Sequence, residues 1–459
     1  MLKQLFGFLF DDSKDPAPAL VHPEEVTYGA LKQAAWSAAA GLKARRARPG
    51  VILPVTGRGL NFCAAYFGSL LAGNVPLLME TSDDADLEKA AGRADLVLTD
   101  EAGAKRAQGI APRDKILVLE ELMGGGVDPG LSFEGFGKNE PMTILLTSGS
   151  TGDPKTTVKT AGTIADELAV LKDLHAAGPS DCYFCAVPWV HIYGLLNGFL
   201  LPLSAGAGIM ATGAFIPREA LALLKKCTVF LGVPIQYKAM TEIGDPGGGP
   251  LRLSFSSGAA LSTELAGRFK ELTGIPVTEI YGSTEMGSVA VRKNPDETGW
   301  DVFPVIRWKA GEDNELLIQS PLAEAPAGQG PGMAWYGSGD CIRVLEDGKF
   351  ELAGRKSDII KVGGKRVSAR EIEEALHRTG LVYDVAVAPY YNRRSCSEKI
   401  GAIVVLVEGG DADRRAIRKK CRELLPSFKV PDKIVFVEKI PRTRTGKVRY
   451  SDIHTLLKL

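Results

Sequence analysis

The stretch Thr147-Ser-Gly-Ser-Thr-Gly-Asp-Pro-Lys155 follows the apolar run 142–146 directly. That run is typical of a buried strand. The two glycines let backbone N–H groups turn toward an anion, the hydroxyl side chains add donors, and Lys155 adds a cation. The spacing differs from a Walker loop, and Pro154 with the β-branched residues 156–158 predicts that the chain continues as a strand. We therefore interpret the stretch as a phosphate-binding loop in preference to an ordinary polar surface loop.

Strands and helices alternate on both sides of this loop. Helices are expected at Thr27–Leu42 and Phe62–Ala72. The expected strands are Gly50–Thr56, Val75–Met79, Leu96–Thr99, Ile116–Leu119, Tyr183–Val187, Gly206–Ala211 and Val229–Val233. Such alternation predicts an α/β fold, with a large N-terminal body built on parallel sheets.

The pattern changes near Gly299 and again near Gly354. Short strands joined by turns follow Gly299 and predict a β-rich subdomain that ends the body. From Arg355 to Leu459 a small α+β module is expected, with 24 Lys and Arg against 13 Asp and Glu. Residues 1–354 hold 31 against 42. Because the charge and the pattern change together, the sequence predicts two domains, 1–354 and 355–459.

Composition limits the class of protein. The chain has 459 residues, of which 45% are hydrophobic, and 55 basic residues balance 55 acidic ones. A balanced charge favours neither nucleic acid nor an anionic membrane as a partner. Seven scattered cysteines fit a reducing cytoplasm, and the Cys182–Cys185 pair is expected to be packed thiols and not a zinc site. The apolar segment Met1–Phe10 is too short to span a bilayer and is expected to pack on the body as a terminal helix, so we expect no stable membrane insertion.

Six further motifs follow the phosphate loop in a fixed order. They are Pro188-Trp-Val-His-Ile-Tyr-Gly194, Ser256-Ser-Gly-Ala-Ala-Leu261, Tyr281-Gly-Ser-Thr-Glu285, Tyr336-Gly-Ser-Gly-Asp340 with the segment Gly354–Glu373, and Pro441-Arg-Thr-Arg-Thr-Gly-Lys447. Together they resemble the adenylate-forming superfamily of acyl-CoA synthetases, aryl-CoA ligases, luciferases and adenylation domains. The resemblance covers nearly the whole chain, and the common order is more specific than any single motif.

The resemblance implies a site for ATP and Mg²⁺. Tyr281 would stack on adenine, Glu285 would bind Mg²⁺ as a hard oxygen ligand, and Asp340 would accept from both ribose hydroxyls. Taken alone, Glu285 could be a carboxylate in a first helical turn and Asp340 a turn residue before a strand. The residues expected to bind ATP are Thr147, Ser148, Gly149, Ser150, Thr151, Gly152, Lys155, Ser257, Gly258, Ala259, Tyr281, Gly282, Asp340 and Arg355.

The resemblance also implies two half-reactions at one site. Lys447, Thr284 and Glu285 would stabilise charge while acyl-AMP forms and pyrophosphate leaves. The C-terminal module would then rotate about a hinge near Ser357, where the family usually has Asp or Lys. Gly364 would let the backbone approach a pantetheine arm. The acceptor is either CoA or the phosphopantetheine of an acyl carrier protein, and the basic module suits both.

The resemblance implies that the substrate is a small carboxylic acid. His191, Tyr193, Gly232 and Ser256, with Gly364, are the expected substrate contacts, and the aromatic and apolar lining favours an aryl or a short or medium-chain acyl acid. The histidine segment lacks the aspartate of amino-acid adenylation domains. Three alternatives stay open: an acyl-AMP ligase with a non-thiol acceptor, a non-catalytic nucleotide-binding module of the same fold, and a dinucleotide oxidoreductase based on Gly57-Arg-Gly59, which lacks the third glycine of that fingerprint.

Overall fold

The structure is a computed structural model. It describes residues 2–45, 49–81, 83–124, 137–147, 155–323, 334–356, 359–362, 365–392, 397–407, 409–410, 412–441, 453 and 455–457. Its contacts divide the chain into two compact units. Unit 1 comprises Met1–Thr298, Phe303–Ile306 and Ser320–Ala334, and unit 2 comprises Gly299–Val302, Arg307–Gln319 and Trp335–Leu459. Most of the β-rich segment therefore groups with the C-terminal module, while the domain boundary at Gly354 stays a prediction.

The first sheet of unit 1 has the order β6-β5-β3-β4-β7-β8. Its strands are β3 (Val51–Val55), β4 (Val75–Met79), β5 (Leu96–Thr99), β6 (Ile116–Val118), β7 (Pro141–Thr147) and β8 (Lys155–Thr160). The strands β6, β5, β3, β4 and β7 pair in parallel in that order, and β8 returns antiparallel to β7. Thr147 and Lys155 are partners in that last pairing, so the phosphate loop connects two adjacent strands as expected.

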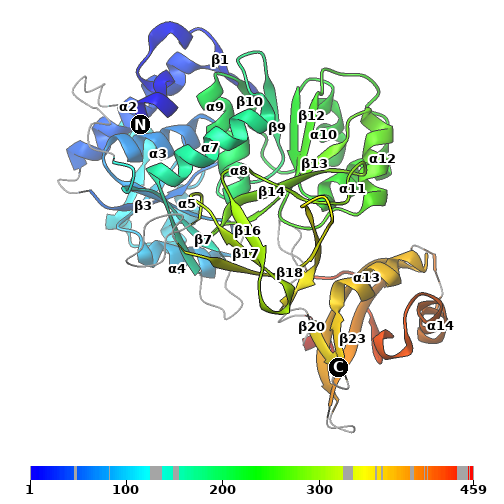
Figure 1. The fold of residues 1–459 in the computed structure, drawn as a ribbon. Coiled ribbons are helices and arrows are strands. Elements are labelled where there is room, and N and C mark those ends of the chain that lie inside the picture. The colour runs from blue at the N-terminus through cyan, green and yellow to red at the C-terminus, as the bar shows by residue number, and fades with distance from the viewer. Residues whose placement is uncertain are drawn as a thin grey trace. The chain divides into compact units, whose positions relative to one another are not determined.

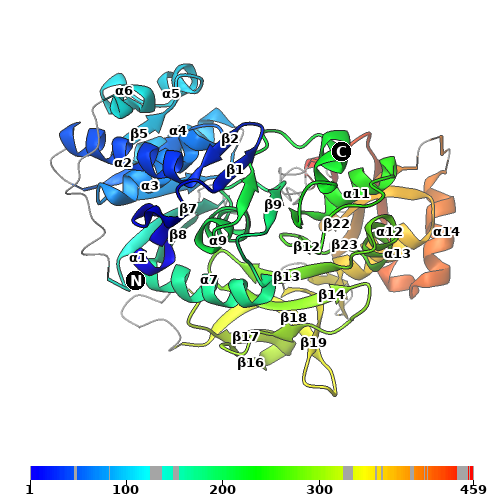
Figure 2. The ribbon, with the colours of Figure 1, turned by 90° about the horizontal axis from the view of Figure 1, so that it is seen from above.

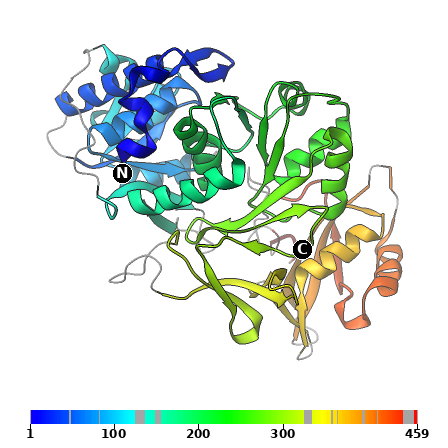
Figure 3. The same cartoon turned by 45° about the horizontal axis from the view of Figure 1, so that its top comes forward.

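The second sheet of unit 1 continues in the order β14-β13-β12-β11-β9-β10-β1-β2. These strands are β1 (Pro18–His22), β2 (Glu25–Thr27), β9 (Cys182–Cys185), β10 (Gly208–Met210), β11 (Val229–Gly232), β12 (Leu253–Ser256), β13 (Val277–Ser283) and β14 (Gly287–Asn294). Neighbouring strands pair in parallel along the series β1, β10, β9, β11, β12 and β13. At the two ends of this series, β2 pairs antiparallel with β1 and β14 pairs antiparallel with β13. The strands β9 to β14 of this sheet run side by side in green in Figure 3.

Helices cover both sheets of unit 1 (Figure 1). They are α1 (Leu2–Leu5), α2 (Tyr28–Arg45), α3 (Leu60–Leu71), α4 (Asp84–Arg93), α5 (Ala104–Ile110), α6 (Leu119–Met123), α7 (Ala161–His175), α8 (Ile192–Leu195), a π-helical turn (Leu196–Leu200), α9 (Leu201–Ala205), α10 (Pro217–Leu224), α11 (Pro234–Ile243) and α12 (Thr263–Thr273). The alanine-rich α2 packs closely on α3, where a Cβ on Gly68 would lie 2.7 Å from the Cβ of Ala38. Small residues allow that approach, which explains the composition of the two helices.

The N-terminal segment packs on the body, but it is not one helix. It consists of the short α1 and a 3₁₀ turn at Gly7–Leu9, and Phe6, Phe8 and Leu9 are buried in the core of unit 1. A helix over Met1–Phe10 was therefore the wrong prediction for its local structure. The alternation of buried aromatic residues at 6 and 8 explains the difference, since both rings pack on Phe67. Within the described residues, no helix has the length and apolarity that a membrane crossing requires.

Unit 2 holds β15 (Asp301–Val302) and three small sheets. The first, in yellow in Figure 1, has the order β16-β17-β18-β19, formed by Arg307–Ala310, Glu315–Gln319, Tyr336–Val344 and Phe350–Arg355. The second pairs β20 (Ile359–Val362) with β21 (Lys365–Ser368), and the third has the order β22-β23-β24, formed by Val382–Asn392, Ser397–Leu406 and Lys433–Phe436. The helices α13 (Ala369–Arg378) and α14 (Arg414–Leu424) share one hydrophobic core with the last two sheets.

Candidate active site

The residues of the candidate site follow the carboxyl ends of neighbouring parallel strands. The strands β9, β11, β12 and β13 point the same way, so their carboxyl ends meet at one edge of the sheet. His191 follows β9, Gly232 and Ser256 end β11 and β12, and Tyr281 lies near the end of β13. Ligands of open α/β sheets bind at this edge. Four motifs that are far apart in the sequence thus meet at one place.

The turn between β13 and β14 carries Thr284 and Glu285. The close approach of the two strands requires Gly282, because a Cβ there would lie 2.2 Å from the carbonyl oxygen of Gly287. Gly287 itself has φ +73°, a conformation that favours glycine. The side chain of Ser283 accepts a hydrogen bond from the Met286 N–H at 3.2 Å. Glu285 is thus a turn residue, and its reading as a carboxylate in a first helical turn is wrong.

Lys155 and Glu285 form an ion pair with an Nζ–Oε1 distance of 2.6 Å. The lysine side chain is 53% exposed and the glutamate side chain 18%. Burial opposes ionisation of Glu285, but hydrogen bonds from Lys155, from backbone and from Ser283 outweigh it and lower the pKa of this carboxyl. The residue expected to bind Mg²⁺ is therefore anionic at neutral pH and is in contact with the lysine expected to bind phosphate.

A loop after β12 lies beside Tyr281. Ser257 donates from its hydroxyl to the Ile280 carbonyl at 2.8 Å and so ties this loop to β13 next to Tyr281. Gly258 has φ +84°, and Ala259 is exposed. The Tyr281 ring is partly exposed, as a surface that stacks on a base must be. The arrangement brings together the residues expected on the adenine side.

The residues expected to bind the acid differ in their exposure and in their hydrogen bonds. His191 is partly exposed at the N-terminus of α8, where its Nδ1 accepts a hydrogen bond from the Tyr193 N–H at 3.3 Å. The Tyr193 hydroxyl is buried and donates to the Phe255 carbonyl at 2.9 Å, and burial raises its pKa. A Cβ on Gly232 would lie 2.9 Å from the Phe230 ring, so packing alone requires a glycine there. His191 keeps an accessible ring, whereas the polar atom of Tyr193 is already engaged.

Ser256 is fully buried at the end of β12. Among the described residues, its hydroxyl has no hydrogen-bond partner. A buried hydroxyl at the site edge can donate to a bound oxygen atom at little cost. This geometry suits the predicted role of Ser256 in substrate binding.

Asp340 and Arg355 face each other in unit 2. They are register partners on β18 and β19, and the Arg355 Nε donates to the Asp340 carboxylate at 3.0 Å. The Asp340 side chain is 9% exposed and that of Arg355 is 60% exposed. Asp340 lies within a strand, so its reading as a turn residue is wrong. The structure therefore pairs Asp340, expected to bind the ribose, with Arg355, also expected to bind ATP.

Several predicted site residues lie outside the described residues. They are Ser148, Gly149, Ser150, Thr151, Gly152, the hinge candidate Ser357, Gly364 and Lys447. Their roles stay predictions.

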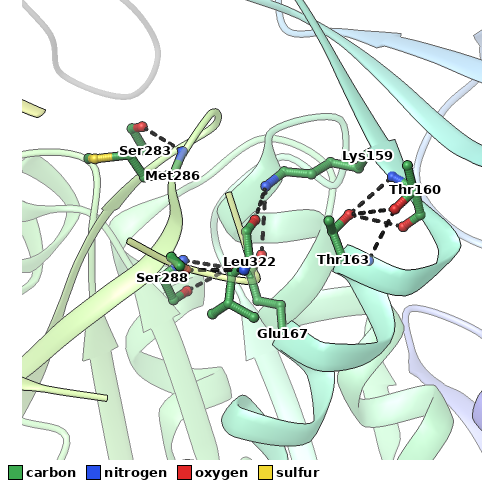
Figure 4. A network of polar contacts seen from close by, with 9 residues as sticks. Lys159, Thr160, Thr163, Glu167, Ser283, Met286, Ser288 and Leu322 are labelled. Atoms are coloured by element: carbon green, nitrogen blue, oxygen red, sulfur yellow. Dashed lines mark hydrogen bonds and ion pairs between the residues drawn. The ribbon is translucent and has the colours of Figure 1, made fainter. Parts of the chain in front are cut away.

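A second lysine–glutamate pair lies beside the β13–β14 turn (Figure 4). Lys159 and Glu167 are 0% and 2% exposed, with an Nζ–Oε2 distance of 3.9 Å. The Glu167 carboxylate accepts from both the N–H and the hydroxyl of Ser288, at 2.7 and 2.8 Å. Sequence reasoning missed this pair. The available signal was the placement of Lys159 four residues after Lys155 on a strand, which puts both side chains on one face.

Comparison with known proteins identifies the fold and family. The family pattern described as AMP-binding enzyme matches residues 12–329, and the pattern described as AMP-binding enzyme C-terminal domain matches residues 371–447. The chain belongs to the AMP-binding enzyme family. The prediction of an adenylate-forming superfamily member is thereby confirmed, and a dinucleotide oxidoreductase is the wrong alternative.

Curated relatives of this AMP-binding enzyme are CoA ligases by name. The mitochondrial malonate–CoA ligase of Homo sapiens is 29% identical over 377 residues, which cover 68% of this chain and 65% of that protein. The benzoate–CoA ligase of Thauera aromatica is 28% identical over 448 residues, which cover 85% and 83% of the two chains.

A solved structure confirms the predicted fold class. ATP-bound MatB from Rhodopseudomonas palustris superimposes with a TM-score of 0.88 at 22% identity, over 98% of each chain. This likeness supports the α/β body with parallel sheets, a β-rich part and a C-terminal α+β part.

Proposed function

We propose that this AMP-binding enzyme is an AMP-forming acid–thiol ligase. It uses ATP to convert a small carboxylic acid into acyl-AMP, releases pyrophosphate, and transfers the acyl group to a thiol. The observation that carries the proposal is the 2.6 Å contact between Lys155 and Glu285 at the carboxyl edge of the sheet. It brings the cation at the end of the phosphate loop to the carboxylate of the Tyr281–Glu285 motif, as nucleotide activation requires.

The residues present suit Mg²⁺ bound together with phosphate. No cluster of three or more His, Cys, Asp or Glu side chains that could hold a metal occurs in the described part of the chain. Mg²⁺ is commonly held by one or two carboxylates together with substrate phosphates and water, so the single anionic Glu285 fits this ion. When bound, Mg²⁺ neutralises the phosphate oxygens. Glu285 would hold the ion, Lys155 would release Glu285 and contact phosphate, and the buried Thr284 hydroxyl would donate to the α-phosphate.

CoA is the favoured acceptor, because the curated relatives are CoA ligases by name. The phosphopantetheine of an acyl carrier protein is the second candidate, which the excess of basic residues after Gly354 favours. Lys447 for adenylation, Gly364 for the thiol channel and a hinge at Ser357 complete the proposal. The six described cysteines are free, in agreement with the proposed cytoplasmic location.

Carboxylate-dependent ATP–pyrophosphate exchange, without thiol, tests the proposal directly. The panel contains malonate and other short dicarboxylates, benzoates, hydroxycinnamates, fatty acids and amino acids. Exchange with one class establishes adenylation and identifies the acid, after which CoA and a carrier protein are compared as acceptors. A folded protein that binds ATP and exchanges with no acid would favour the non-catalytic alternative, and product formation without a thiol would favour a non-thiol acceptor.

A further inference from the structure

The turn that carries Glu285 is hydrogen-bonded to the buried carboxylate of Glu167. Ser288 is the second residue after Met286 and begins the return strand β14 with Gly287. Its N–H and its hydroxyl both donate to one oxygen of Glu167, at 2.7 and 2.8 Å. Glu167 lies on α7, which packs against β8, and Figures 2 and 4 show this helix beside the sheet. The two hydrogen bonds therefore attach the end of the turn to α7.

The backbone of the turn also passes close to this carboxylate. A Cβ on Gly287 would lie 3.0 Å from the Glu167 Oε2 and 2.9 Å from the Leu322 Cβ. The approach is so close that only a glycine fits without displacing one of these groups. The close approach at Gly287 and the hydrogen bonds of Ser288 both place the turn against the Glu167 side chain.

Lys159 supplies a positive charge next to the buried Glu167 carboxylate. A glutamate that is 2% exposed is strongly disfavoured as an anion unless a cation lies near it. Lys159 supplies that cation at 3.9 Å and donates to the Leu322 carbonyl at 3.1 Å. A charged acceptor binds N–H and O–H donors more strongly than a neutral one, so the pair holds Ser288 more tightly than an amide would.

The same strand carries both lysines. Side chains alternate along β8, so Lys155 and Lys159 lie on one face. Lys155 contacts Glu285 at one end of the turn, while Lys159 neutralises the anchor at its other end. Strand β8 starts where the phosphate loop ends. Any shift of the turn relative to β8 therefore changes the distance between Glu285 and the phosphate-binding lysine.

We propose that Glu167, neutralised by Lys159, is a positioning residue that holds the Ser283–Ser288 turn so that Glu285 meets the Mg²⁺ of bound Mg·ATP. The inference rests on the proposed function of this site and adds residues that do not touch the substrate. Glu167 acts through Ser288 and Gly287. Outer groups that orient metal-binding residues typically change metal affinity or activity by about 10–100-fold.

Two double variants separate the anchor from the charge. Lys159→Met with Glu167→Leu removes both charges and the acceptor of Ser288, whereas Lys159→Met with Glu167→Gln removes both charges but keeps an acceptor. The Kd of ATP is measured by calorimetry with and without Mg²⁺, so the result does not depend on knowing the acid. We expect the leucine variant to raise the Kd of Mg·ATP by about 10-fold or more and to leave the Kd of metal-free ATP within about threefold. The glutamine variant should recover most of the affinity for Mg·ATP.

Matched controls distinguish positioning from stability. Asp181→Asn replaces another buried carboxylate of unit 1, which accepts a hydrogen bond from Arg252 at 2.7 Å. Asp181 and Arg252 directly precede β9 and β12, at the amino ends of these strands. This variant should leave the affinity for Mg·ATP unchanged. If the leucine variant fails to fold, Ser288→Ala decides, because it removes only one donor and should still weaken Mg·ATP more than metal-free ATP. Wild-type Mg·ATP affinity in the folded leucine variant, or in Ser288→Ala where that variant decides, would overturn the inference. So would equal losses in both double variants. Failure of the proposed function would appear separately, as absent exchange in the wild-type protein that still binds Mg·ATP.

Discussion

Two lysine–glutamate pairs begin four residues apart on the same strand, and they differ in almost every property. Lys155 and Glu285 are 2.6 Å apart, and the lysine is half exposed. Lys159 and Glu167 are 3.9 Å apart, and both are buried. The first pair can exchange its partners with an incoming ligand, because water and ligand reach it. The second cannot, since separating it would leave a lone charge in the core.

The difference assigns separate tasks to the two pairs. An exposed ion pair contributes little to stability, so it can be opened cheaply when Mg·ATP binds. A buried pair is costly to break from one side, so it suits a fixed support. The site thus combines an exchangeable contact with a rigid one, and both act on the single turn between β13 and β14.

Lys159→Met should give the largest effect on stability. It leaves the Glu167 carboxylate buried without its cation, and loss of one partner of such a pair costs about 3–5 kcal/mol. Lys155→Met, with the same change of side chain at an exposed position, should alter the free energy of unfolding by less than about 1 kcal/mol. Urea denaturation followed by circular dichroism measures both. Equal losses would remove the distinction between the two pairs.

Glu285→Gln should reverse this order when activity is measured. Replacing one preorganised charged group at the reacting phosphates typically costs about 10²–10³-fold in rate, whereas the fold should be retained. Pyrophosphate exchange over a range of Mg²⁺ concentrations measures the loss, with the exposed Glu271→Gln on α12 as a control. A glutamine variant that exchanges at the control rate would mean that Glu285 does not serve the metal.

The sequence singled out both members of one pair, though not their contact, and neither member of the other, for a physical reason. Lys155 and Glu285 belong to motifs whose residue types carry chemistry, and the β-branched residues 156–158 predicted a strand where β8 lies. Glu167 stands in an ordinary amphipathic helix, and only the packing of α7 against β14 shows that it meets Ser288. The engagement of Tyr193 with Phe255 and the mutual pairing of Asp340 with Arg355 were equally inaccessible, because each contact joins segments that local patterns treat separately. Many element positions, in contrast, follow from local periodicity, although the helix expected over Met1–Phe10 did not.

Gly287→Ala tests how closely the turn packs against the buried Glu167 side chain. The substitution places a Cβ in a left-handed residue and against both Glu167 and Leu322, so we expect a loss of about 1–3 kcal/mol in the free energy of unfolding. Gly274→Ala is the matched control, since Gly274 has φ +77° at the end of α12 and open space around it. The control should show only the backbone cost of about 1 kcal/mol. If both variants lose the same stability, the turn is not pressed against the carboxylate.

The smallest effect concerns pH and the exposed pair. The pKa of Glu285 is lowered in the folded protein, so its ionisation stabilises the fold above the ordinary carboxyl pKa, and this stabilisation is lost as the pH falls through the lowered value. Lys155→Met removes the hydrogen bond that lowers the pKa and leaves the burial that raises it. The variant should therefore be less stable than the wild type at pH 7, by less than about 1 kcal/mol, and the difference should be smaller at pH 3, below the ordinary carboxyl pKa. Urea midpoints of both proteins at the two pH values measure this. A difference at pH 3 as large as that at pH 7 would come from lost packing of the lysine stem, and the exposed pair would then resemble its buried neighbour in acting through structure and not through charge.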